Sequence, residues 1–317
     1  MLCTVKCLRA CVLLSVCGVG LCGARAAELT AEDQAKITQA LPAKAAAKPK
    51  RPRKLLLLNV NVNDTGRRPD VHVSLPFGNF AIVEMGKKTG AYETVLRTDI
   101  QALDPENLKQ FDAICFNNTT GVLTTDEKLR RSLLSYVAGG KGFVAFHAGG
   151  GATFVQHPKY DQFPEFGVMV GGYENGGPPW NVRDTVYVRV DDPKSPVTAA
   201  FHGQEFPIHE EVYQFQEPYS REKLHVLLSI DLEKSDYDPK RRHPLPPRAA
   251  DRDFANAWIK TYHKGRVFYS AFGHNPATFE NPQMLEFFLA GIQYTLGDLK
   301  ADDRPSAAIA ARQKTKN

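Results

Sequence analysis

The chain has 317 residues, a formal net charge of +5 and 43% hydrophobic residues, which suits one large globular domain or two small ones. Six of its basic residues lie within residues 44–54 and four more follow Asp303, so the remainder is neutral to slightly acidic. Nucleic-acid binding by the folded part is therefore not expected.

The first 26 residues have the features of a secretory signal peptide. Two basic residues come before an apolar stretch at residues 10–22, and Ala-Arg-Ala at residues 24–26 resembles a cleavage site. We therefore expect a secreted or periplasmic protein. The apolar stretch is too short to span a bilayer, and no other run approaches that length, so stable membrane insertion is not expected. Five of the six cysteines lie in this segment, and Cys115 is expected to be a buried, unreactive thiol.

Residues 27–53 are rich in Ala, Lys and Pro, a composition that predicts a short helix at most, followed by a flexible linker. The ordered domain is expected over residues 54–300. Residues 301–317 are expected to form a disordered tail.

Predicted strands and helices then alternate along the chain. Apolar runs predict strands at residues 55–60, 92–97, 111–118 and 143–147, with helices at residues 79–88 and 125–137. A loop that contains His72 joins the first strand to the first helix. This alternation with short connections predicts a parallel sheet with helices on both faces.

The second half of the domain is more irregular. Residues 148–184 are rich in glycine and predicted loops, and long loops in a compact domain usually carry function. Further strands are predicted at residues 185–190 and 226–230, an antiparallel hairpin at residues 257–262 and 266–272, and an amphipathic helix at residues 284–296. The charged, proline-rich residues 231–252 are predicted to form a surface loop.

His147 stands between a predicted buried strand and three glycines, in the sequence Phe-Val-Ala-Phe-His-Ala-Gly-Gly-Gly. Ligands of open α/β sheets bind at the carboxyl ends of the strands, and glycine-rich turns bring backbone N–H groups close to them. This exposed strand end suits a catalytic or metal-binding histidine. A structural histidine in a tight turn fits the same residues about equally well.

Three further residues could share a site with His147, namely His72, Glu211 and His274. Neutral imidazoles and a carboxylate are common ligands of zinc and related divalent ions. The four residues lack the fixed spacing of a zinc finger or a His-Glu-x-x-His helix, so the sequence alone favours ordinary structural or surface roles.

The segment around Glu211 is informative if it is extended. Alternation would then place His209 and Glu211 on one face, with Glu210 on the other. Tyr213 would share the Glu211 face, where it could orient a substrate hydroxyl or pack as a half-buried strand aromatic.

Aromatic residues in the loops are candidate platforms for sugar rings. Tyr173 follows two glycines, and Trp180 lies in a Gly/Pro loop, whereas Trp258 stands inside a predicted strand and is expected in the core. The sequence has no nucleophile elbow, no dinucleotide fingerprint after the first strand and no P-loop, so the corresponding enzyme classes are not expected.

Taken in order, the motifs of the predicted domain resemble the ThuA-like (trehalose-utilisation) family. The resemblance covers residues 54–298, through segments 55–60, 71–76, 111–121, 139–148, 171–173, 210–215, 262–269 and 272–274. It implies a flavodoxin-like sheet related to class I glutamine amidotransferases, and a role in sugar metabolism that includes keto-disaccharides. A bound divalent metal, zinc or similar, is also implied. Its candidate ligands are His72, His147 and His274, and Asn118 is a candidate substrate-binding residue.

The chain departs from the family pattern in three places. It has Glu210-Glu211 where the family has Asp-Glu, glycines at 149 and 150 after His147, and His263 in place of a glycine. The first change keeps an acid, and the second is expected to alter substrate fit. No cysteine follows the 143–146 run, so glutamine hydrolysis through a thiol is not expected.

Two functions therefore stay open. The first is a secreted sugar-metabolism enzyme that cleaves a glycoside or keto-glycoside by hydrolysis or elimination, or isomerises it, with metal assistance and with three catalytic residues, His147, Glu211 and His274. The alternative is a non-catalytic carbohydrate-binding protein that uses Tyr173, Trp180 and Tyr213. A glycosidase with paired carboxylates is a weaker third reading, because only Glu211 is well placed. The sequence does not determine the oligomeric state.

Overall fold

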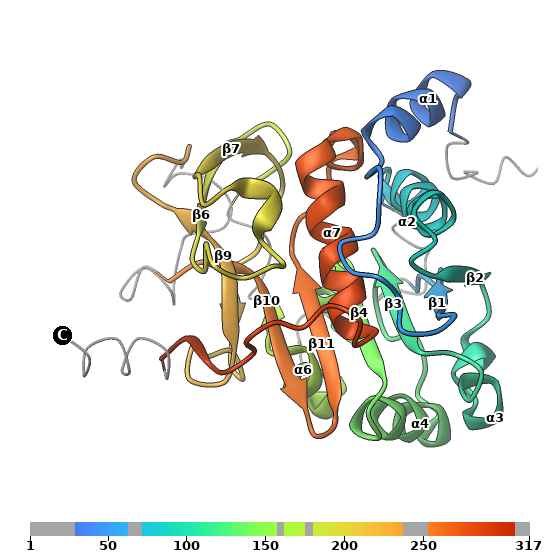
Figure 1. The fold of residues 1–317 in the computed structure, drawn as a ribbon. Helices are drawn as coiled ribbons and strands as arrows, with labels where there is room; N and C mark the ends of the chain where they lie inside the picture. The colour runs from blue at the N-terminus through green and yellow to red at the C-terminus, as the bar shows by residue number, and fades with distance from the viewer. Residues whose placement is uncertain (1–28, 63–71, 157–161, 175–179, 237–252, 308–317) are drawn as a thin grey trace, which may run out of the picture.

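The computed structural model describes residues 29–62, 72–156, 162–174, 180–236 and 253–307. The predicted signal peptide and most of the predicted loop at residues 231–252 lie outside these ranges. Figure 1 shows one large sheet with helices packed against it.

Five neighbouring strands of this sheet are parallel. They lie in the order β2 (Glu93–Arg97), β1 (Lys54–Leu58), β3 (Ala113–Asn117), β4 (Gly142–Phe146) and β11 (Gly265–Ser270). This order, with the first strand between the second and third, is that of flavodoxin-like sheets. The predicted α/β fold class, with a flavodoxin-like, mostly parallel sheet, helices on both faces and an added antiparallel hairpin, is confirmed.

The antiparallel part extends beyond the predicted hairpin. Next to β11 lie β10 (Ala255–Tyr262), β9 (His225–Asp231), β6 (Thr185–Val190) and β7 (Phe206–His209). A two-stranded sheet pairs β5 (Tyr173–Glu174) with β8 (Phe215–Gln216). β7 matters for the site, because the chain reaches Glu210 and Glu211 directly after it.

The parallel strands are buried on both faces, which explains their continuous apolar runs. In β1, Leu55 and Leu57 belong to one core, and Leu56 and Leu58 to the other. The first core is covered by α1 (Ala31–Ala40), α2 (Leu75–Thr89) and α7 (Pro282–Thr295). The second lies under α3 (Pro105–Leu108), α4 (Glu127–Ala138) and α6 (Pro164–Val170). Figure 1 shows α7 lying across β4 and β11.

The segment at residues 29–53, predicted to be a flexible linker, docks onto the domain instead. α1 packs against α2 and the 3-10 helix η3 (Pro276–Glu280), and it buries Ile37 completely. Further along, the Ala47 amide donates to Gln293 Oε1 at 3.0 Å. The linker was predicted from the average composition of the segment. That average does not show the few apolar residues that complete a core formed by the rest of the chain.

Part of the predicted tail also packs on the domain. The Ser306 amide donates to the Leu224 carbonyl at 2.9 Å, and His225 Nδ1 donates to the Arg304 carbonyl at 2.8 Å. Residues 308–317 lie outside the described ranges. Among the described residues, none of the helices has the length and hydrophobicity needed to cross a bilayer.

Candidate active site

Three histidines lie beyond the carboxyl ends of parallel strands, either directly after the strand or in the loop that follows it. His72 stands just before α2, the helix that follows β1, while His147 comes directly after β4 and His274 follows β11. Because parallel strands end at one edge of the sheet, the topology brings these residues together. Glu211 reaches the same place from the end of β7.

The predicted convergence of these four side chains is confirmed. His274 Nδ1 lies 3.1 Å from Glu211 Oε1 and 3.0 Å from His147 Nε2. His147 Nε2 is 3.6 Å from the same carboxylate oxygen. The ring of His72 stands edge-on to both other imidazoles, at centroid distances of 5.1 and 4.8 Å. One ligand atom from each histidine lies within 4.8 Å of the others.

The tautomer of His147 follows from its neighbours. Its Nδ1 lies 2.7 Å from the Ala271 carbonyl, which can only accept, so Nδ1 carries the proton. Nε2 therefore presents a lone pair toward the cluster, where the Tyr213 hydroxyl donates to it at 2.8 Å. A backbone carbonyl that fixes one ring nitrogen while the other faces the site is typical of metal-binding histidines.

His147 is held in an unusual backbone conformation. Its φ of 47° and ψ of −119° place it where L-residues are rare, at the start of α5 (Ala148–Gly151). The sequence suggested an exposed strand end, but the side chain is fully buried. Such strain costs about 1–3 kcal/mol and is concentrated at functional sites.

The glycines after His147 have a packing reason. A Cβ at Gly149 would stand 2.1 Å from the Phe116 carbonyl oxygen, so the turn lies directly against β3. A Cβ at Gly150 would meet the ring of Tyr269 at 2.4 Å. The missing side chains, which the sequence suggested would alter substrate fit, therefore let the turn pack against β3 and β11.

Burial and charge make the cluster suitable for a cation. Burial, together with His147 and His274, lowers the pKa of His72 to about 3, and burial likewise lowers the pKa of His147, so both rings are neutral at neutral pH. Burial would raise the pKa of Glu211, but contacts with His147 and His274 outweigh it and lower that pKa well below its usual range. His72 Nδ1 is buried and has no hydrogen-bond partner among the residues that the structure describes. Three imidazoles, one with an unused nitrogen, and a carboxylate fit a divalent metal such as zinc.

Comparison with known proteins identifies the family of this chain. A family model for ThuA, described as trehalose utilisation, matches residues 60–295. The chain belongs to the ThuA family. No curated protein sequence matches it.

A solved structure of a ThuA-like protein from Bacteroides uniformis shares the fold. It is 21% identical, with a TM-score of 0.57, and the alignment covers 78% of this chain and 93% of that protein. Another from Parabacteroides merdae is 16% identical, with a TM-score of 0.49 and coverage of 79% and 92%. The predicted family resemblance is confirmed.

No role was predicted for Glu210, a further residue of this ThuA domain. Its side chain is fully buried and points away from the cluster into the loop that carries His274. Burial raises the pKa of Glu210 to about 7, although hydrogen bonds from Thr278, Asn275 and Gly273 act in the opposite direction. The signal for a separate role of Glu210 was present in the sequence. It was the pair of adjacent acids, whose side chains are placed on opposite faces by the alternation of an extended segment.

The predicted stacking role of Tyr173 and Trp180 is contradicted by their burial. Their exposed fractions are 4% and 1%. The Tyr173 hydroxyl donates to the Phe163 carbonyl at 2.6 Å, and the Trp180 ring packs edge-on against Phe254 at 5.5 Å. Neither ring therefore offers a face to a sugar. Trp258 lies in the core, as predicted.

Asn118 lies beside the cluster, although its contact with a substrate stays a prediction. It is fully buried, with a φ of 52°, and its Nδ2 donates to the Gly273 carbonyl at 3.0 Å. Its Oδ1 has no hydrogen-bond partner among the described residues. This unused acceptor stands next to the loop that carries His274.

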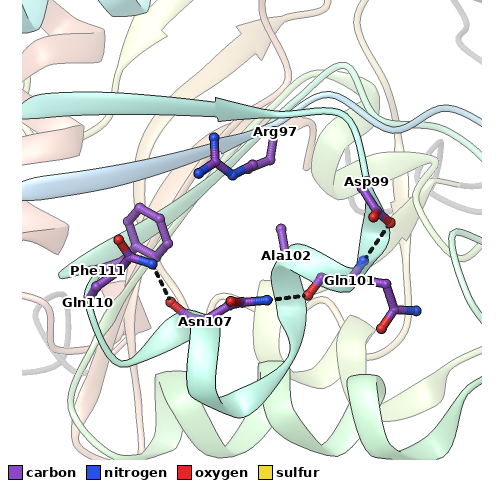
Figure 2. A pocket seen from close by; sticks show the side chains of 7 residues that line it. All are labelled: Arg97, Asp99, Gln101, Ala102, Asn107, Gln110 and Phe111. Carbon is purple, nitrogen blue, oxygen red and sulfur yellow. Dashed lines mark hydrogen bonds between the residues drawn. The ribbon is translucent and has the colours of Figure 1, made fainter.

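A separate surface pocket lies away from the histidines (Figure 2). Its lining comes from the end of β2 and the segment before β3, and includes Arg97, Asp99 and Phe111. Its hydrogen bonds are local, such as the one from Asn107 Nδ2 to the Gln101 carbonyl at 2.9 Å. None of the four cluster residues lines this pocket. Its local hydrogen bonds do not indicate a catalytic role.

Proposed function

We propose that this ThuA-family protein is a secreted or periplasmic enzyme that acts on a glycoside or keto-glycoside with the help of a divalent metal. Membership of the family supports a role in sugar metabolism. The observation that carries the enzymatic part is the meeting of three imidazoles and a carboxylate at one point.

The proposed ligands are His72, His147 and His274, each of which can offer one ring nitrogen to the ion. A bound divalent ion would supply a Lewis acid for a carbonyl or hydroxyl oxygen of the sugar. The Ala271 carbonyl keeps the proton of His147 on Nδ1, so Nε2 stays available to the site.

Glu211 is the proposed proton acceptor, or a further ligand. Its side chain is 19% exposed and that of His274 is 28% exposed, whereas His147 is fully buried. A substrate therefore approaches from the side of Glu211 and His274. A carboxylate in this position can take a proton from water, which leads to hydrolysis, or from a carbon next to a keto group, which leads to elimination or isomerisation.

The alternative of a non-catalytic sugar-binding protein receives less support. It depended on exposed aromatic faces, and Tyr173 and Trp180 are buried. A glycosidase with paired carboxylates is also disfavoured, because Glu210 is engaged by the loop that carries His274 and so is not a second acid in the site.

The test combines metal analysis with turnover. We expect the purified protein to retain about one equivalent of zinc or a similar ion after dialysis and to convert a keto-disaccharide in a screen of native and keto sugars. His274→Ala should lose both properties. His263→Asn is the matched control, since His263 lies in the turn before β11, at the opposite end of the strand from His274. Metal-free protein that binds sugars without converting any of them would overturn the proposal.

A further inference from the structure

The loop between β11 and α7 carries His274, and the carboxylate of Glu210 holds the backbone of this loop. Oε2 accepts from the Gly273 amide at 3.2 Å, and Oε1 accepts from the Asn275 amide at 2.8 Å. The Thr278 hydroxyl donates to the same carboxylate.

These contacts lie on both sides of His274. Gly273 and Asn275 are its chain neighbours, so the carboxylate determines the path of the backbone directly before and after it. The Gly273 carbonyl is held from the opposite side, where it accepts from Ser74 Oγ at 2.7 Å and from Asn118 Nδ2 at 3.0 Å. Gly273, the residue before His274, is therefore held through both its amide and its carbonyl group.

We propose that Glu210 is a positioning residue that acts through His274, because its buried carboxylate holds the 273–278 loop so that His274 Nδ1 meets His147 and Glu211. The proposal rests on the proposed function in one respect only, which is the role of His274 as a metal ligand. It assigns different tasks to two adjacent acids, one fixing the loop and the other facing the substrate.

The contacts favour an ionised carboxyl group. Four donors converge on it, the amides of Glu211, Gly273 and Asn275 and the Thr278 hydroxyl, and a carboxylate offers acceptors only. A glutamine at this position would point its NH₂ group at an amide or hydroxyl donor and lose at least one bond. An aspartate would keep the charge but shorten the reach by one methylene.

The decisive experiment is a double-mutant cycle. We expect Glu210→Gln to weaken Zn²⁺ binding by about 10–100-fold, the usual range for groups that orient metal ligands. In a His274→Ala background, where the weaker remaining affinity is measured by direct Zn²⁺ titration rather than by retention after dialysis, the same change should weaken binding by less than about twofold, because the group through which it acts is gone. Glu286→Gln, an exposed change on α7, is the control. Equal losses in both backgrounds would show a general structural role and overturn the proposal.

A second measurement separates this proposal from the metal hypothesis. In metal-free protein, Glu210→Gln should speed hydrogen exchange of peptides that span residues 271–281 by at least about tenfold. Thr278→Val, which removes one of the four hydrogen bonds to Glu210, should act in the same direction more weakly, and it serves if Glu210→Gln does not fold. If wild-type protein binds no Zn²⁺, the metal hypothesis fails while the exchange result still decides the role of Glu210. Unchanged exchange in both variants would overturn it.

Discussion

The ring of Tyr213 stacks on the ring of His147, with centroids 4.5 Å apart and planes inclined by 17°. The hydroxyl of the same tyrosine donates to His147 Nε2 at 2.8 Å. One side chain therefore fixes the plane of the imidazole and occupies the lone pair that faces the site. A ligand that takes this lone pair must displace the hydroxyl, which is then free to donate to the ligand or to a substrate.

Tyr213→Phe tests this arrangement, because it keeps the stacked ring and removes the hydroxyl. We expect a loss of about 1 kcal/mol in the free energy of unfolding, as for one buried hydrogen bond, and a fall in kcat of at least about tenfold. Tyr92→Phe is the control, since the buried Tyr92 hydroxyl donates to the Ile82 carbonyl at 3.0 Å and lies outside the site. Equal kcat values in the two variants would remove Tyr213 from the mechanism.

Glu211→Gln separates the two roles proposed for this acid. If Glu211 accepts a proton, kcat should fall by about two to four orders of magnitude while the metal content stays the same. If Glu211 is a ligand, metal content and activity should fall together. Metal analysis and steady-state kinetics on one preparation distinguish these results. Full activity in both Glu211→Gln and His147→Ala would contradict the site.

The backbone strain at His147 predicts an inverted order of stability. Alanine normally stabilises a chain relative to glycine, but at φ 47° and ψ −119° it retains the strain that glycine relieves. We expect His147→Gly to unfold with a free energy about 1–2 kcal/mol higher than that of His147→Ala. Urea unfolding of the two variants measures the difference. A more stable alanine variant would show that the turn changes conformation when the imidazole is removed.

The docked segment at residues 29–53 predicts a stability cost when its contacts are cut. Ile37 is fully buried, so Ile37→Ala should lower the free energy of unfolding by about 2–5 kcal/mol. Val168→Ala should change it little, because Val168 is 49% exposed. Thermal unfolding of both variants, beside a protein shortened to residues 54–300, checks the expectation. Equal melting temperatures for the shortened and full chains would mean that the segment contributes nothing.

The parallel half of the sheet could be predicted because its strands are buried on both faces. That burial gives unbroken apolar runs such as Leu55 to Leu58, which can be recognised in the amino-acid sequence alone. The meeting of His147 with His274 followed from topology alone, since parallel strands end at one edge.

Features that depend on distant contacts could not be predicted. Trp180 stands in a Gly/Pro loop, and only the position of Phe254, far along the chain, shows that its ring is covered. The strain at His147 arises from the close approach of the following turn to β3. No role was predicted for Glu210 because its partners in the loop that carries His274 follow it by more than 60 residues.

The hydrogen bond between Ala47 and Gln293 joins positions separated by 246 residues. The core face beneath α7 includes Phe146, whose ring lies 4.5 Å from that of Phe288. This face stays uncovered until α7 docks, and only then can the segment around Ala47 form its hydrogen bond with that helix. We therefore expect α7 and the segment around Ala47 to close the domain together, late in folding.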